Sequence, residues 1–186
     1  MPKIKTSKEE ILKKVIPVLK SKGVQNSSMS ELSIACGIQK SHFYYYFNNK
    51  EELIKEVLIM VHSYFNYNFR KIIDSNLVMI KKVENLKTLL DKTFSTTEGG
   101  CIMASTALET LHLNPVYKKE IQLFFKDFIS GLQQMLELNH THEESLLLAE
   151  QIVQDFEGGI LLTQVYNNPK YLNNAVSRME KTLLNT

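Results

Sequence analysis

The stretch that decides the fold is residues 28–47, SMSELSIACGIQKSHFYYYF. Ser28 lies three residues before Glu31, which is the spacing of a capping box at the start of a helix. Gly37 can adopt the left-handed backbone conformation that ends a helix, and a second short helix is expected to begin near Gln39. Two short helices joined by a glycine turn predict a helix-turn-helix.

The second of these helices has an apolar side and a polar side. Phe43 and Phe47 are spaced i, i+4 and predict one buried stripe. The residues expected where the two helices meet are Leu32, Ala35, Cys36, Ile38, Phe43 and Phe47. The residues left for the outward faces are Gln39, Lys40, Ser41, His42, Tyr44, Tyr45 and Tyr46. This outward surface offers donors to phosphates and base edges, although ordinary packing of the tyrosines and solvated lysines are the alternative.

Charge along the chain supports a polyanionic partner. Residues 1–50 hold nine lysines and three glutamates, a net charge of +6, and no Asp or Glu occurs between Gln39 and Lys50. Residues 51–186 hold 13 basic and 17 acidic residues, a net charge of −4. A basic end on an acidic body is typical of nucleic-acid binding, with a solvated lysine-rich surface as the alternative.

Composition narrows the class of protein. The chain has 186 residues, of which 44% are apolar and 23% charged, as in ordinary globular proteins. Two cysteines make no disulfide framework, and we find neither an N-terminal apolar signal region nor a stretch long enough to span a membrane, so a cytoplasmic location is expected. Seven glycines, no phosphate-binding loop and no strand-like alternation exclude nucleotide-binding α/β folds and leave an all-α protein.

Helix start signals divide the chain. Capping-box spacings begin at Ser7, Ser28, Asn49 and Thr141, and Asn-Pro pairs at 114–115 and 168–169 mark two further starts. With apolar residues at helical spacing after each signal, the pattern predicts helices at about 7–22, 28–36, 39–46, 49–73, 79–97, 101–112, 115–138, 142–166 and 169–184. Pro17 inside the first helix predicts a kink or a late start there.

The N-terminal pattern resembles the TetR family of bacterial transcriptional regulators. The resemblance covers roughly residues 7–58 and rests on Gly23, Ser28, Cys36-Gly37-Ile38, Phe43-Tyr44-Tyr45-Tyr46-Phe47 and Lys50-Glu51-Glu52-Leu53. Gln39 and Tyr46 depart from the usual Ser and His, and Ser41-His42 stands where Gly-Thr is frequent. Gln39 therefore predicts a weaker helix cap, and Ser41-His42 are candidates for what distinguishes this protein's operator.

The resemblance implies an N-terminal three-helix helix-turn-helix domain at 1–50 and a helical effector-binding and dimerisation domain at 51–186. It implies a ligand-responsive regulator, most often a repressor, which binds a pseudo-palindromic operator in double-stranded DNA as a homodimer and has no enzymatic activity or cofactor. The DNA-binding residues implied are Ser28, Gln39, Lys40, Ser41, His42, Tyr44, Tyr45 and Lys50.

The remaining domain is expected to bind a small, mainly apolar effector and to dimerise. The residues expected to line the effector site are Tyr64, Phe65, Phe69, Phe94, Met103, Phe124, Phe128 and Phe156, although each also suits an ordinary core. The apolar stripe expected at the dimer interface is Leu147, Ile152, Phe156, Ile160, Leu161, Leu172, Val176, Met179 and Leu183, with Gly158-Gly159 for close approach. An intramolecular core would use the same stripe.

Other chemistry remains open from the sequence. A helical enzyme or small-molecule-binding protein would place His62 or His112 in a pocket, and a helical interaction protein would dock its basic end on an acidic partner. Cys101 after Gly99-Gly100 begins a helix, a position that lowers a thiol pKa and suits redox sensing. His140-Thr141-His142-Glu143 has the composition of a metal site, but a solvated turn at a helix start explains it better.

Overall fold

The computed structural model describes residues 6–94, 99–113 and 115–185. Within these ranges the secondary structure is nine α-helices and one 3-10 turn, with no strands, as the all-α prediction requires. The helices are α1 (Lys8–Lys22), α2 (Met29–Ala35), α3 (Lys40–Tyr46), α4 (Lys50–Ile73), α5 (Met79–Phe94), α6 (Ile102–Thr110), α7 (Lys118–Leu136), α8 (His142–Tyr166) and α9 (Lys170–Leu184), with the turn η1 (Leu111–Leu113) after α6.

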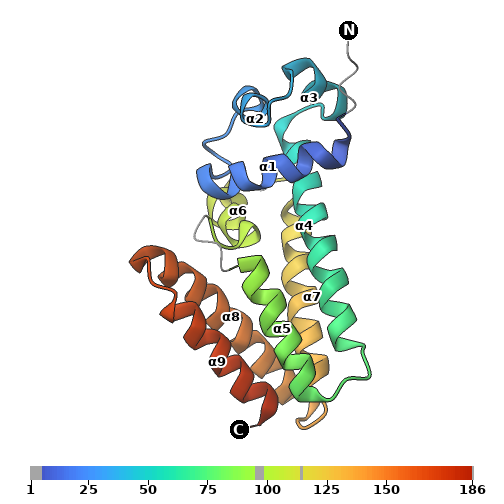
Figure 1. Ribbon diagram of the computed structural model, residues 1–186, viewed down its shortest axis with the longest axis vertical. Coiled ribbons are helices and arrows are strands. Elements are labelled where there is room, and N and C mark those ends of the chain that lie inside the picture. The colour runs from blue at the N-terminus through green and yellow to red at the C-terminus, as the bar shows by residue number, and fades with distance from the viewer. Residues whose placement is uncertain (1–5, 95–98, 114, 186) are drawn as a thin grey trace.

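The arrangement places α1, α2 and α3 at one end of an elongated molecule (Figure 1). The long helix α4 leaves this end and runs into the helical body, where it packs against α5 and α7. Helices α8 and α9 form an antiparallel pair, and α8 also packs against α7. The single helix α4 therefore joins the helix-turn-helix to the C-terminal bundle.

The predicted start signals act largely as expected. Ser7, Ser28 and Thr141 each form a complete capping box with the Glu three residues later. At α4 the Asn49 side chain accepts from the Glu52 amide, but the Glu52 carboxylate accepts from the Asn48 amide and so closes a different ring. The α9 start agrees with the prediction within one residue, with Pro169 as the N-cap.

The predicted start of α7 was wrong. Helix α7 begins at Lys118 rather than at Pro115, because residues 115–117 form a turn in which the Lys118 amide donates to the Pro115 carbonyl and Tyr117 is buried. Asn114, the other half of that start signal, lies outside the described residues. Of the kink or late start expected from Pro17, the late start does not occur, since α1 begins at Lys8 and continues through the proline to Lys22.

The centre of the C-terminal bundle is an aromatic core. Six buried phenylalanines from α4, α5, α7 and α8 contact one another with ring centroids 5.1–6.4 Å apart: Phe65, Phe69, Phe94, Phe124, Phe128 and Phe156. Gly131 on α7 makes room for this core, because a Cβ there would lie 2.4 Å from the Phe69 ring. The aromatic core thus holds α4 against α7, and α4 is the helix that connects the N-terminal helices to the bundle.

Candidate DNA-binding surface and effector pocket

The helix-turn-helix is built from its own buried contacts. Gly37 has φ +65° and ends α2, as predicted, so that the chain can turn into α3. Leu32, Phe43 and Phe47 are fully buried, and the Phe43 and Phe47 rings lie 6.4 Å apart. These contacts fix α3 on α2 and determine which side of α3 faces solvent.

The outward side of α3 carries most of the side chains proposed for DNA. Gln39, Lys40, Ser41, His42, Tyr44 and Tyr45 are all exposed, and Tyr45 retains 80% of its accessible surface. The Lys40 ammonium lies 5.9 Å from the centre of the Tyr44 ring, so the two side chains lie close together on this surface. No acidic side chain lies on α3. The surface therefore offers one ammonium group, hydroxyls, a side-chain amide and an imidazole without a repelling carboxylate.

The remaining two predicted DNA-binding residues lie at helix starts. Ser28 is the exposed N-cap of α2, and its hydroxyl already accepts from the Glu31 amide. Lys50 is the first residue of α4 and is half-buried. Tyr46 has a different role, since its hydroxyl donates to the Thr6 carbonyl at 2.9 Å and ties the segment before α1 to α3.

Polar contacts connect this end of the molecule to the bundle. The Gln25 amide, in the connection between α1 and α2, donates to the Glu109 carboxylate of α6 at 2.7 Å, and the Gln25 side chain donates to the Glu109 carbonyl at 3.2 Å. At the N-terminal end of α1, Lys8 pairs with Glu56 of α4 at 3.0 Å. A shift of α6 relative to α4 therefore changes the support beneath the helix-turn-helix.

A cavity of about 290 Å³ lies between the two ends of the molecule, where α1, α4, α5, α6 and α7 meet. Five of the eight predicted effector-site residues line it: Tyr64, Phe65, Phe94, Met103 and Phe124. The other three, Phe69, Phe128 and Phe156, are buried in the aromatic core and are not among the lining residues. Helical spacing alone could not separate Phe65, Phe94, Met103 and Phe124 from these three, because all seven belong to one continuous apolar cluster.

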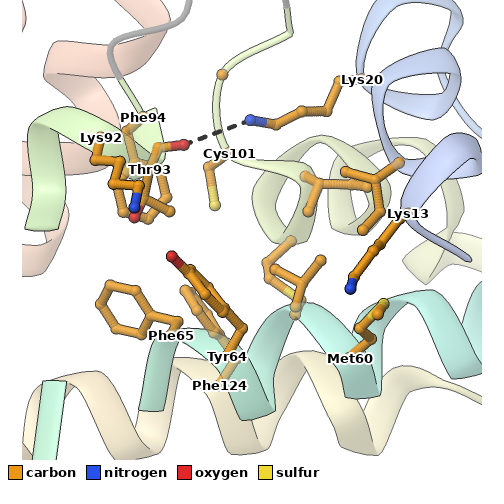
Figure 2. A pocket seen from close by; sticks show the side chains of 15 residues that line it. Lys13, Lys20, Met60, Tyr64, Phe65, Lys92, Thr93, Phe94, Cys101 and Phe124 are labelled. Carbon is orange, nitrogen blue, oxygen red and sulfur yellow. Dashed lines mark hydrogen bonds between the residues drawn. The ribbon is translucent and has the colours of Figure 1, made fainter. Parts of the chain in front are cut away.

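The cavity also has lining residues that the sequence pattern did not indicate. Ile16 comes from α1, Met60 and Val61 from α4, and Ile102 from α6. Lys13, Lys20 and Lys92 are at its edge, and the Cys101 thiol points into it (Figure 2). The sequence pattern did not indicate that α1 lines the cavity, because the apolar stripe of α1 predicts only packing within the N-terminal domain.

Cys101 does not have the lowered pKa expected of a residue at a helix start. The residue is the N-cap of α6, but it is buried, and burial raises the pKa of its thiol well above the usual value. The neighbouring Glu157 carboxylate acts in the same direction by charge repulsion. Burial also raises the pKa of Glu157 to about 7, while its hydrogen bond with Cys101 acts against that rise. The helix-terminus effect is thus outweighed by burial.

Most residues of the predicted dimer stripe are buried within the chain, and others are exposed. Ile152, Phe156, Ile160, Leu172, Met179 and Leu183 are buried within the chain. Gly159 serves the same internal packing, since a Cβ there would lie 3.0 Å from the Ala175 methyl of α9. The opposite side of α8 carries the half-buried Gly158 and, at spacing i+3, i+4 and i+7 from it, the exposed Leu161, Leu162 and Val165. Leu161 is 53% accessible and Val165 is 64% accessible.

The alternative chemistries find little support in the geometry. His62 contacts Asp127 across α4 and α7 at 2.8 Å but does not line the cavity, and His112 is exposed on η1. His142 contacts Glu137 at 2.6 Å beside the Thr141 capping box. Among the described residues no group of three metal-ligating side chains occurs, and no helix there is long and apolar enough to cross a membrane.

Comparison with known proteins decides the family. The family model of bacterial regulatory proteins of the tetR family matches residues 11–57. The C-terminal domain of LmrA/YxaF-like transcriptional regulators matches residues 80–178, more than half of the chain. The chain belongs to the TetR family. The resemblance found in the helix-turn-helix is therefore confirmed, and this TetR-family protein is a ligand-responsive transcriptional regulator that binds DNA.

Individual relatives of this TetR-family chain span nearly its whole length. The HTH-type transcriptional repressor DhaR of Mycobacterium sp. (strain GP1) is 23% identical, covering 95% of this chain and 92% of the relative. An HTH-type transcriptional regulator from the lacX 3'region of Lactococcus lactis subsp. lactis is 24% identical, over 87% and 85%. The crystal structure of a TetR regulator from Legionella pneumophila is 25% identical, with a TM-score of 0.86 over 97% of this chain and 99% of that one.

Proposed function

We propose that this protein is a cytoplasmic, homodimeric repressor that binds a pseudo-palindromic operator and releases it when a small, mainly apolar effector enters the cavity. Residues 1–50 would form the DNA-binding domain and residues 51–186 the effector-binding and dimerisation domain, without enzymatic activity. The observation that carries the proposal is the exposed, acid-free face of α3. The cavity that α1 lines together with the bundle supports the effector-responsive part of the proposal.

On the operator, α3 would enter the major groove. Gln39, Lys40, Ser41 and His42 lie at the start of α3 and would face bases or phosphates, while Tyr44 and Tyr45 would reach phosphates on the groove walls. Ser28 and Lys50 stand at the starts of α2 and α4, where backbone N–H groups favour anions, and would bind phosphates. Together these residues would position one recognition helix in one half-site.

A second copy of the chain would supply the other half-site. One helix reads only a few base pairs, so two recognition helices about 34–36 Å apart, or a multiple of that distance, are needed for a pseudo-palindrome. The interface would be the apolar stripe of α8 formed by Gly158, Leu161, Leu162 and Val165, since the three aliphatic side chains are exposed and a Cβ on Gly158 would meet no atom within 4 Å.

Effector binding would act through the elements that line the cavity. The cavity touches α1 and α4 directly, and α6 holds the α1–α2 connection through Glu109 and Gln25. An effector that binds one arrangement of these helices more tightly shifts the dimer toward recognition helices at the wrong separation. A few kcal/mol of differential affinity is sufficient for a large change in operator occupancy.

Binding to DNA fragments from the protein's own genomic neighbourhood tests the proposal. Fluorescence anisotropy at 50 and 200 mM salt should reveal tight binding to one pseudo-palindromic fragment, weakening steeply with salt. Lys40→Ala should weaken that binding at least tenfold and Tyr44→Phe about fivefold, because each removes a contact to DNA.

The matched control is Lys126→Ala, which removes the same charge from an exposed position on α7. Its affinity should stay within about twofold of the unchanged protein. Equal affinity in Lys40→Ala and Lys126→Ala would contradict the proposed orientation of α3. Uniformly weak binding to every fragment would contradict an operator in that neighbourhood.

A further inference from the structure

The edge of the effector cavity is strongly basic. Its lining includes three lysines, Lys13 and Lys20 from α1 and Lys92 from α5, and no aspartate or glutamate of the described residues. The walls below them are apolar, formed by aromatic rings, methionines and aliphatic side chains. Figure 2 shows the Tyr64 hydroxyl on the same side of the cavity as Thr93, whose carbonyl receives the Lys20 hydrogen bond. The cavity therefore combines an apolar interior with a cationic rim.

Lys20 is the most favourably placed of the three cations. It is half-buried, and burial lowers the pKa of its ammonium group. Its ammonium donates to the Thr93 carbonyl at 3.4 Å, a long contact, and no described carboxylate lies within 4 Å of it. A desolvated ammonium with a weak neutral acceptor is stabilised when an anion replaces the lost water.

The other two lysines differ in whether they already pair with a carboxylate. Lys13 already pairs with Glu9 at 2.6 Å in an exposed contact on α1. Lys92 has no salt bridge with a described carboxylate, and Figure 2 shows it beside Thr93 across the cavity from Lys13. An anion bound by Lys20 would therefore lie between α1 and α5, with Lys92 as the second cation.

We propose that the effector is an amphipathic monoanion, an apolar body carrying one carboxylate, and that Lys20 is the residue that selects the charge. The apolar body packs on Phe65, Phe94 and Phe124, and the carboxylate pairs with Lys20 in place of the Thr93 carbonyl. This inference rests on the proposed function and specifies its ligand class. Because Lys20 belongs to α1, the charge on the effector acts directly on the helix that supports the helix-turn-helix.

Isothermal titration calorimetry with matched acids and amides tests the assignment. The probes are decanoate and 4-phenylbutanoate, each below its micelle concentration, with decanamide and 4-phenylbutanamide as neutral counterparts of the same shape. The unchanged protein should bind at least one acid at least tenfold more tightly than its amide. Lys20→Met should reduce that preference to within about threefold, and Lys20→Arg should retain it.

Lys22→Met is the matched control, since Lys22 is exposed on the same helix and does not line the cavity. It should keep the full preference for the acid. Amides that bind as tightly as the acids, a preference that survives in Lys20→Met, or no binding of any of the four probes would overturn the assignment. Circular dichroism verifies that each variant is folded.

Operator binding without a probe separates this inference from the proposed function. If the protein binds its operator but shows no preference for the acids, the regulator stands and the anionic effector is refuted. If it prefers the acids but binds no operator, the ligand class stands and the proposed repressor is refuted. With both intact, the acids should weaken operator binding by the unchanged protein and have little effect on Lys20→Met.

Discussion

Replacing Glu157 by glutamine tests the electrostatics beside the effector cavity. Glu157 lies on α8 next to Cys101, is mostly buried, and its Oε1 atom has no hydrogen-bond partner among the described groups. Burial raises the pKa of its carboxyl from 4.5 to about 7, and the hydrogen bond with Cys101 opposes only part of that rise. The protein therefore folds most stably with this side chain protonated.

The size of the effect follows from linkage. One pKa unit corresponds to about 1.4 kcal/mol, so the rise from 4.5 to about 7 costs about 3 kcal/mol of unfolding free energy once the side chain is ionised. The folded protein holds a proton that the unfolded chain releases between these two pH values. The free energy of unfolding therefore falls as the pH rises from 4.5 to 7, and it stays lower above 7.

Glutamine has a shape similar to that of glutamate but no ionisable group, so Glu157→Gln should remove this pH dependence of the free energy of unfolding. Urea unfolding at fixed protein concentration should give the variant an advantage of about 3 kcal/mol at pH 8 and of about 1 kcal/mol or less at pH 5. The control is Glu143→Gln, an exposed position on the same helix, whose difference from the unchanged protein should vary little with pH. An advantage of Glu157→Gln that is equal at both pH values would refute the reasoning.

Two further predictions concern coupling and assembly. Glu109→Ala removes the acceptor for the Gln25 amide and should weaken operator binding about fivefold, which corresponds to about 1 kcal/mol. The helix content in circular dichroism should not change. Unchanged operator affinity would argue against a role of α6 in supporting the helix-turn-helix. Leu161→Glu should convert the proposed homodimer to a monomer in analytical ultracentrifugation, because it places a charge on the apolar stripe of α8. Leu138→Glu, at an exposed position outside that stripe, should leave the proposed dimer intact.

The dimer prediction shows where sequence periodicity reaches its limit. Apolar residues lie on more than one side of α8, so their periodicity could not decide which side packs against α9 and which side is exposed. Gly158 and Gly159 illustrate the point, since they are adjacent in the sequence. A Cβ on Gly159 would contact α9, while a Cβ on Gly158 would meet no atom within 4 Å.

The chemistry of the cavity between α1 and the bundle was likewise only partly predictable from the sequence. Its aromatic lining was partly predicted, because buried phenylalanines were visible as helical stripes. Its lysines were not predicted, because Lys20 and Lys92 are separated by more than seventy residues and line one cavity only when α1 packs against α6 and Lys20 reaches the Thr93 carbonyl of α5. The raised pKa of Cys101 likewise depends on burial among residues distant in the chain.

By itself the sequence determined the helical class, most of the helix starts and which side of α3 is exposed. These features depend on capping hydrogen bonds, a glycine turn and i, i+4 contacts between residues close together in the chain. Only the tertiary structure decided which phenylalanines face the cavity, which face of α8 remains exposed, and how strongly Glu157 and Cys101 are desolvated. Those properties are set by the packing of distant helices, since burial and local dielectric are properties of the assembled core.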